Sequence, residues 1–192
     1  MYTSKNNVSI RLKSGGHSFS EVELREMISS TDSVDAVVLT PKTVLVPAEV
    51  FDNECAQDNL VAVGLAPCLN ECVVATEPID GVVAVMAINA ECNKVLRNAA
   101  AELTFSTPLL SSKTIEDGSI LHIEDGLLYV RVYNKGLQFA DVVACKSDAD
   151  IIYYLAKIDE VYNIFNMSAR AMGDITLIKH IAKRLFKELI CE

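Results

Sequence analysis

The sequence predicts a mixed α/β fold, and two observations support this. Segments with alternating apolar and polar residues, which are typical of half-buried strands, are interleaved with segments whose apolar residues recur at helical spacing. The chain has 192 residues and is 51% hydrophobic, which is enough for one domain or two small lobes with a true core. Only 6% of the residues are aromatic and none is Trp, so we expect an aliphatic core.

The charge balance limits the partners that this protein can have. The formal net charge is -9, from 17 Lys and Arg against 26 Asp and Glu. Such a surface repels phosphate backbones and anionic lipids, so we expect neither nucleic acid nor a membrane as a partner. The most apolar run, residues 81–90, is about half of the ~20 residues that span a bilayer. With no signal peptide recognised in residues 1–13, we expect a cytoplasmic protein whose six cysteines are free thiols.

The first half is predicted to open with a hairpin. Residues 8–13 alternate like a half-buried strand, Ser14-Gly15-Gly16 suits a tight turn, and residues 17–19 form a short return strand. Ser20 and Glu23 fit a capping box that would start a helix over 21–29. The elements expected next are strands at 34–39 and 43–46, a helix from Pro47 to about Val63, strands at 72–76 and 81–88, a helix at 89–103 and a strand at 104–109.

The second half has the clearest pattern: three strands, a helix, a strand and a helix. Asp125-Gly126, between apolar strands, is a strong signal for a hairpin turn, and Asn134-Lys135-Gly136 predicts a second turn. Ser147 is a suitable N-cap for a long amphipathic helix. The expected elements are strands at 119–123, 127–133 and 137–144, a helix at 148–165, a strand at 167–172 and a final helix from Gly173-Asp174 to about Cys191.

This order of elements is that of the ribonuclease-H-like fold, and two such units make the actin-like ATPase fold. We therefore predict two ribonuclease-H-like lobes, residues 1–110 and 118–192, with mixed sheets and helices packed on them. A linker near residues 111–117 would join them. The step is an analogy between topologies, and a shared fold does not by itself carry a function.

Short motifs spread along the chain resemble a known family. They are Ser9-Ile10-Arg11-Leu12 with Gly16 and Phe19-Ser20, Val46-Pro47 with Phe51, the acidic-aromatic helix start Asp150 to Leu155, and Gly173 after a strand. Together they resemble the domain-of-unknown-function 3822 family of Bacteroidetes. The resemblance implies a degenerate actin-like fold with no assigned activity.

Two hairpin turns are the candidate phosphate loops. In an actin-like ATPase each such turn carries an Asp and small residues, so that backbone N–H groups approach the phosphates and the Asp holds Mg²⁺ through water. Here the turn with Gly15 and Gly16 has no acid, and the turn with Asp125 and Gly126 has one glycine before two leucines. Ordinary hairpin turns are the preferred interpretation; if ATP and Mg²⁺ do bind, these four residues and Gly173 would hold them.

The cysteine pair, the basic final helix and three carboxylates do not predict a further functional site. Cys68 and Cys72 lack a second close pair of ligands, so no metal site is predicted. The basic final helix, with Lys179, Lys183, Arg184 and Lys187, suits a helix docked on a sheet better than a binder of membranes or acidic partners. A nuclease would need Glu124, Asp141 and Asp174 to converge on two metals, which the sequence does not show.

The sequence therefore favours a protein with no catalytic residues and no cofactor. The preferred function is a scaffold or regulatory binding protein that kept an actin-like fold and lost its ATPase loops. The alternative is an actin-like protein that binds ATP with weak or no hydrolysis. The partner is expected to be a protein, and a second copy of this chain is one of the choices left open.

Overall fold

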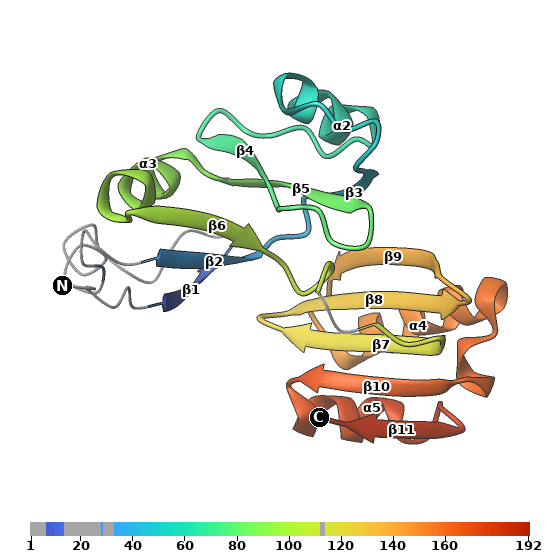
Figure 1. Ribbon diagram of the computed structural model, residues 1–192. Helices are drawn as coiled ribbons and strands as arrows, with labels where there is room; N and C mark the ends of the chain where they lie inside the picture. Colours follow the sequence, from blue (N-terminus) through green and yellow to red (C-terminus); the bar gives the residue numbers. More distant parts are fainter. Residues whose placement is uncertain (1–6, 14–27, 29–32, 112–113) are drawn as a thin grey trace, which may run out of the picture. The chain divides into compact units, whose positions relative to one another are not determined.

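The computed structural model describes residues 7–13, 28, 33–111 and 114–192 (Figure 1). The chain divides into two compact units, residues 1–112 and 113–192, and each is described by itself. The turn with Gly15 and Gly16 and the return strand expected at 17–19 lie outside the described residues, as does the helix expected at 21–29 apart from Ile28.

The first sheet of unit 1 is entirely parallel in its described part. Its strand order is β1-β2-β6, and each strand is parallel to its neighbour. Apolar residues from the strands and from α3 form one core, with Leu12, Val34 and Leu96 buried. The elements are β1 (Asn7–Lys13), β2 (Ser33–Leu39), α3 (Ala90–Ala99) and β6 (Glu102–Ser106).

A small antiparallel sheet is inserted between β2 and α3. Its order is β3-β5-β4, and α2 lies against it (Figure 1). The central strand β5 is apolar on both faces: Val83 and Val85 pack with Leu60 of α2, whereas Met86 and Ile88 belong to the core of the parallel sheet. The elements are β3 (Thr43–Pro47), η1 (Asn53–Cys55), α2 (Ala56–Ala62), β4 (Glu71–Ala75) and β5 (Val82–Asn89).

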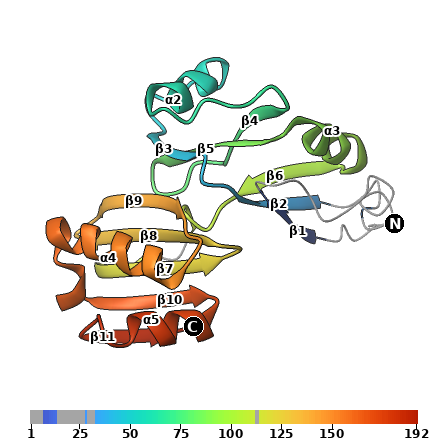
Figure 2. The same cartoon turned by 180° about the vertical axis from the view of Figure 1, so that it is seen from behind.

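Unit 2 is a five-stranded sheet of order β11-β10-β7-β8-β9. Strands β7, β8 and β9, which come first in the sequence, form an antiparallel meander. Strand β10 is parallel to β7, and β11 is parallel to β10. Both helices cover the same face of the sheet (Figure 2), where Leu155 and Ile178 are buried in the core. The elements are β7 (Asp117–Glu124), β8 (Leu127–Asn134), β9 (Leu137–Ala144), α4 (Asp148–Tyr162), η2 (Ile164–Asn166), β10 (Ser168–Gly173), α5 (Ile175–Ala182) and β11 (Glu188–Cys191).

The order of strands and helices in unit 2 agrees with the sequence prediction up to α5, but the prediction of the final helix was wrong. The helix expected to reach Cys191 ends at Ala182, and the chain continues as β11. Residues 183–191 contain no Gly or Pro, so local propensity gives no stop signal. The strand forms because β10 offers an open edge, along which Leu189 pairs with Ala169 of β10. In addition, Leu189 and Cys191 pack on the core.

Several predicted boundaries in unit 1 were also wrong. The helix expected from Pro47 begins only at Asn53, since Pro47 ends β3 and pairs with Val82. The helix expected to reach Leu103 ends at Ala99, and β6 starts at Glu102 rather than Thr104. In the part of the chain that the structure describes, no helix has both the length and the apolar character to cross a membrane.

Candidate functional site

One edge of the sheet in unit 2 gathers the described residues that the sequence singled out for phosphate binding. The parallel strands β7 and β10 end at this edge, as their register of Gly173 with Ile123 shows. The antiparallel β9 also ends there, since Ala144 pairs with Leu127. The arrowheads of β7 and β10 accordingly point the same way in Figure 1. We call this edge, formed by residues 124–126, 145–150 and 173–174, the strand-end edge.

The turn from β7 to β8 is a tight two-residue hairpin. Asp125 and Gly126 have φ angles of 53° and 72°, which are typical of the type I′ turn that joins antiparallel strands. The N–H of Cys145 donates to the carbonyl oxygen of Gly126 at 2.7 Å, which ties the turn to the segment before α4. A side chain at Gly126 would place its Cβ 3.3 Å from the carbonyl oxygen of Cys145. The turn is therefore in close contact with the segment that precedes α4.

The N-terminus of α4, next to this turn, already holds an anion of its own chain. Ser147 and Asp150 form a capping box in which the Asp150 carboxylate accepts hydrogen bonds from the N–H groups of Lys146 (2.8 Å) and Ser147 (2.9 Å). These hydrogen bonds hold the pKa of Asp150 below its usual value, and the bond from the Lys146 N–H has the largest effect. Two backbone donors immediately before the helix are therefore bound to a carboxylate of this chain.

The strand-end edge is strongly acidic. Its three segments carry one lysine, Lys146, and five carboxylates, namely Glu124, Asp125, Asp148, Asp150 and Asp174. Besides Asp150, Glu124 and Asp174 have partners within the chain: Glu124 contacts His122 at 2.9 Å, and Asp174 accepts from the N–H of Leu177 at 3.0 Å. Like charges raise the free energy of a bound polyphosphate, so this edge is electrostatically unsuited to one.

Gly173 has a packing role that needs no ligand. Its φ is +85°, and a Cβ built on it would lie 2.1 Å from the carbonyl oxygen of Ile123 in β7. The same oxygen accepts a hydrogen bond from the N–H of Asp174 at 2.7 Å, so the two backbones meet closely at this point. Only glycine fits, and this explains the residue whether or not a nucleotide binds.

Of the three carboxylates considered for a nuclease, Glu124 and Asp174 lie at the strand-end edge, and Asp141 lies apart from them. Asp141 lies on β9 and pairs with Val130 of β8, so β8 separates Asp141 from Glu124 of β7. Asp174 caps α5. Within the described residues, no three or more His, Cys, Asp or Glu side chains are placed to hold a metal ion.

The cysteine pair of the insertion points to different neighbours. The Cys68 thiol accepts from Lys42 Nζ at 3.2 Å, and the Cys72 thiol accepts from Asn93 Nδ2 at 3.3 Å. Lys42 also forms an ion pair with Glu71. Each thiol therefore has a local polar partner, and the two do not act as one site.

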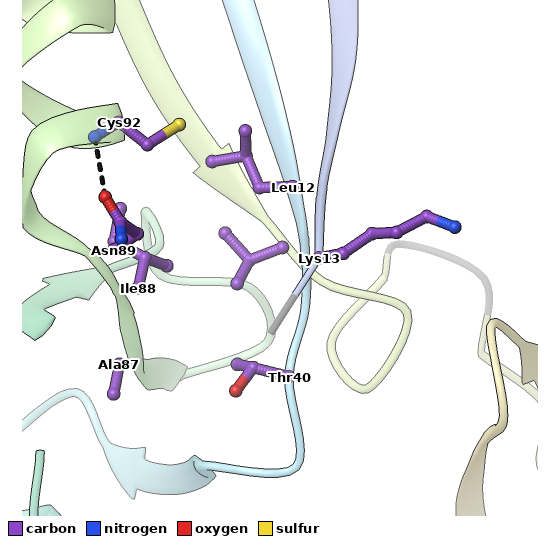
Figure 3. A pocket seen from close by; sticks show the side chains of 8 residues that line it. Leu12, Lys13, Thr40, Ala87, Ile88, Asn89 and Cys92 are labelled. Atoms are coloured by element: carbon purple, nitrogen blue, oxygen red, sulfur yellow. Dashed lines mark hydrogen bonds between the residues drawn. The ribbon is translucent and has the colours of Figure 1, made fainter. Parts of the chain in front are cut away.

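The sequence did not predict a small hollow in unit 1 (Figure 3). It lies where β1 and β2 end and α3 begins, the edge at which open parallel sheets bind ligands. The Asn89 side chain caps α3 by accepting from the N–H of Cys92 at 3.0 Å, which satisfies one helix-end donor. Burial, with a smaller effect of Cys72, raises the pKa of Cys92 to about 11, so its thiol stays protonated. The lining residues are Leu12, Lys13, Val38, Thr40, Ala87, Ile88, Asn89 and Cys92.

The signal for this hollow in the sequence is Asn89, since Asn is a favoured N-cap residue and the predicted helix starts there. In Figure 3 the Lys13 side chain extends away from the other lining residues. Gly15 and Gly16, which follow Lys13 in the chain, lie outside the described residues, so their part in a phosphate loop stays a prediction.

Comparison with known proteins identifies the fold. A protein of unknown function from Bacteroides thetaiotaomicron with an actin-like ATPase fold superposes with a TM-score of 0.76 over 98% of this chain and 91% of that chain, at 16% identity. The fold is actin-like. The fold class predicted from the sequence is thereby confirmed, and the neighbour comes from a Bacteroides species, in keeping with the Bacteroidetes resemblance.

Other comparisons add less. The cytoplasmic domain of EpsL, an inner membrane component of the type II secretion system of Vibrio cholerae, matches with a TM-score of 0.49 and 11% identity over 97% of this chain and 85% of that chain. No protein-family profile matches the actin-like chain, and no curated protein matches its sequence significantly. Membership of the domain-of-unknown-function 3822 family therefore stays a prediction.

Proposed function

We propose that this chain is a non-catalytic scaffold or regulatory binding protein built on an actin-like fold. The observation that carries the proposal is the state of the strand-end edge. Its backbone donors at residues 145–147 are bound to Gly126 and Asp150, and its side chains include five carboxylates against one lysine.

An actin-like ATPase places a triphosphate and Mg²⁺ against turns whose N–H groups are available. At the turn with Asp125 and Gly126, the N–H of Cys145 in the facing segment is already bound to the carbonyl oxygen of Gly126. A phosphate here would displace the Asp150 carboxylate from its two amides and approach four more acids. Both changes cost free energy, and a single Mg²⁺ offsets only two of the negative charges.

The alternative function, ATP binding with weak or no hydrolysis, is favoured by one observation. The hollow in unit 1 lies at the ends of the parallel strands β1 and β2, and Lys13, which lines it, precedes Gly15 and Gly16 in the sequence. A phosphate held there, with Mg²⁺, would need no contribution from the acidic edge of unit 2.

Thermal unfolding with and without ATP and Mg²⁺ separates the two functions. A ligand at about 100 times its Kd stabilises the folded state by ~2.7 kcal/mol, and each kcal/mol moves the Tm of a chain of this size by roughly 2–4 °C. We expect no shift at millimolar ATP with Mg²⁺, compared with Mg²⁺ alone. A reproducible increase in Tm that depends on ATP would overturn the proposal and favour the alternative.

A scaffold must also have a partner. Light scattering and cross-linking of the purified chain test for self-association, and affinity capture followed by cross-linking at defined sites tests for others. A chain that stays monomeric at all concentrations and yields no partner that cross-links to it would contradict the scaffold function.

A further inference from the structure

All charged residues of the antiparallel insertion in unit 1 are acidic. Residues 43–89 contain no Lys, Arg or His and seven carboxylates, namely Glu49, Asp52, Glu54, Asp58, Glu71, Glu77 and Asp80. Of these, Glu71 is neutralised by its ion pair with Lys42. Glu49, Asp52, Glu54 and Asp58 lie on α2 and the segment before it, are exposed, and form no ion pair within the described part of the chain.

The same part of the surface also carries exposed apolar side chains. Val50 is 70% exposed, Val61 49%, Val63 54% and Leu69 109%, and all four lie on α2 or on the segments that flank it. Asp58 and Val61 are three residues apart on α2 and are therefore neighbours on its surface. We call α2 and its flanking segments, residues 49–69, the insertion face.

Unit 2 carries a surface of the opposite charge. Residues 175–187 contain no Asp or Glu, and Lys179, His180, Lys183, Arg184 and Lys187 are all exposed. The apolar side of α5 is buried, with Ile178 1% and Ile181 6% exposed, so the helix is docked and its cations face outward. In the described residues none of these cations has an ion-pair partner. We call this surface the basic face.

We propose that the chain associates with itself head to tail, the insertion face of one copy docking on the basic face of a second copy. Charge complementarity selects this occupant: four unpaired carboxylates on the insertion face meet three lysines and one arginine on the basic face. The exposed valines and Leu69 supply apolar area that desolvates these pairs. This inference names the partner of the proposed scaffold and rests on that function.

The contact is heterologous, so each copy keeps one free insertion face and one free basic face. Such a contact closes into a ring or extends as an open chain, depending on the rotation between copies. A nucleic acid or an anionic membrane would satisfy the basic face alone and would leave the insertion face without a partner. Self-association is the arrangement that uses both surfaces.

Two charge-reversed variants test the inference by light scattering and sedimentation. One is Glu54→Lys with Asp58→Lys on the insertion face; the other is Lys183→Glu with Arg184→Glu on the basic face. We expect the native chain to assemble from micromolar to millimolar concentration and each variant alone to remain monomeric. An equimolar mixture of the two should assemble again, because the reversed faces of the two variants complement each other and so do their native faces.

A control exchanges the charges of an exposed ion pair that belongs to neither face, Lys157→Glu with Glu160→Lys on α4, and should assemble like the native chain. Circular dichroism verifies folding, and alanine replaces the reversed charge in any variant that fails to fold. A monomeric native chain at millimolar concentration, or a reversed variant that assembles alone like the native chain, would overturn the inference. Neither result would affect the ATP melting test, so the non-catalytic function could survive the loss of self-association.

Discussion

Replacing Gly173 by alanine should destabilise unit 2 by considerably more than an ordinary glycine substitution. An L residue at positive φ costs about 1–2 kcal/mol. The added Cβ would also lie 2.1 Å from the Ile123 carbonyl oxygen and 2.9 Å from its carbon, so β10 and β7 must separate locally. Overpacking of this kind costs roughly 1–3 kcal/mol more, which gives a total of about 2–5 kcal/mol.

Gly126→Ala is the matched control in the same unit. Its φ is +72°, close to the +85° of Gly173, but its Cβ would meet only the Cys145 carbonyl oxygen at 3.3 Å. We expect a loss of about 1–2 kcal/mol for this variant, from the backbone conformation alone. Urea denaturation followed by circular dichroism measures both losses as changes in midpoint at constant slope.

Amide hydrogen exchange localises the effect of Gly173→Ala. The N–H of Asp174, which donates to the Ile123 carbonyl oxygen, should exchange faster than in the native chain, together with the amides that pair β10 with β7. The argument from close backbone approach would be refuted if the Gly173 and Gly126 variants unfolded within about 0.5 kcal/mol of each other.

Three further predictions concern the acidic edge and the thiols. Ser147→Ala removes the side chain that caps α4 and should cost about 1 kcal/mol in urea denaturation. The pKa of Asp150 is lower in the folded than in the unfolded chain, so the stabilising contribution of this carboxylate is complete at neutral pH and is lost as the pH falls below about 4. The free energy of unfolding of Asp150→Asn should therefore vary less with pH in this range than that of the native chain. An acid transition as steep as that of the native chain would contradict this. In thiol labelling at pH 8, read by mass spectrometry, the exposed Cys55 and Cys68 should react well before Cys92, which is buried with a pKa raised to about 11; early labelling of Cys92 in the folded chain would show that the core of unit 1 opens.

The candidate site was predicted from sequence in part. Asp125-Gly126 was recognised as a hairpin turn because two-residue turns need positive φ, and the structure has those angles there. Gly173 lies at the same edge because β10 pairs in parallel with β7, and the sequence did not predict this pairing. The contacts at this edge, Cys145 with Gly126 and Asp150 with Lys146, join residues from different elements or depend on the position of a helix end, so only the tertiary structure decides them.

Local patterns determined the fold class. The DG turn, the Ser147 cap and the alternation of apolar residues act over a few residues, and they were sufficient to predict the meander, α4 and the actin-like architecture. Tertiary structure decided what local signals leave open. Residues 188–191 become a strand because β10 presents an unpaired edge, and Gly173 is needed because β7 lies too close for a Cβ. Pairing and close packing depend on partners distant in sequence, so no local pattern encodes them.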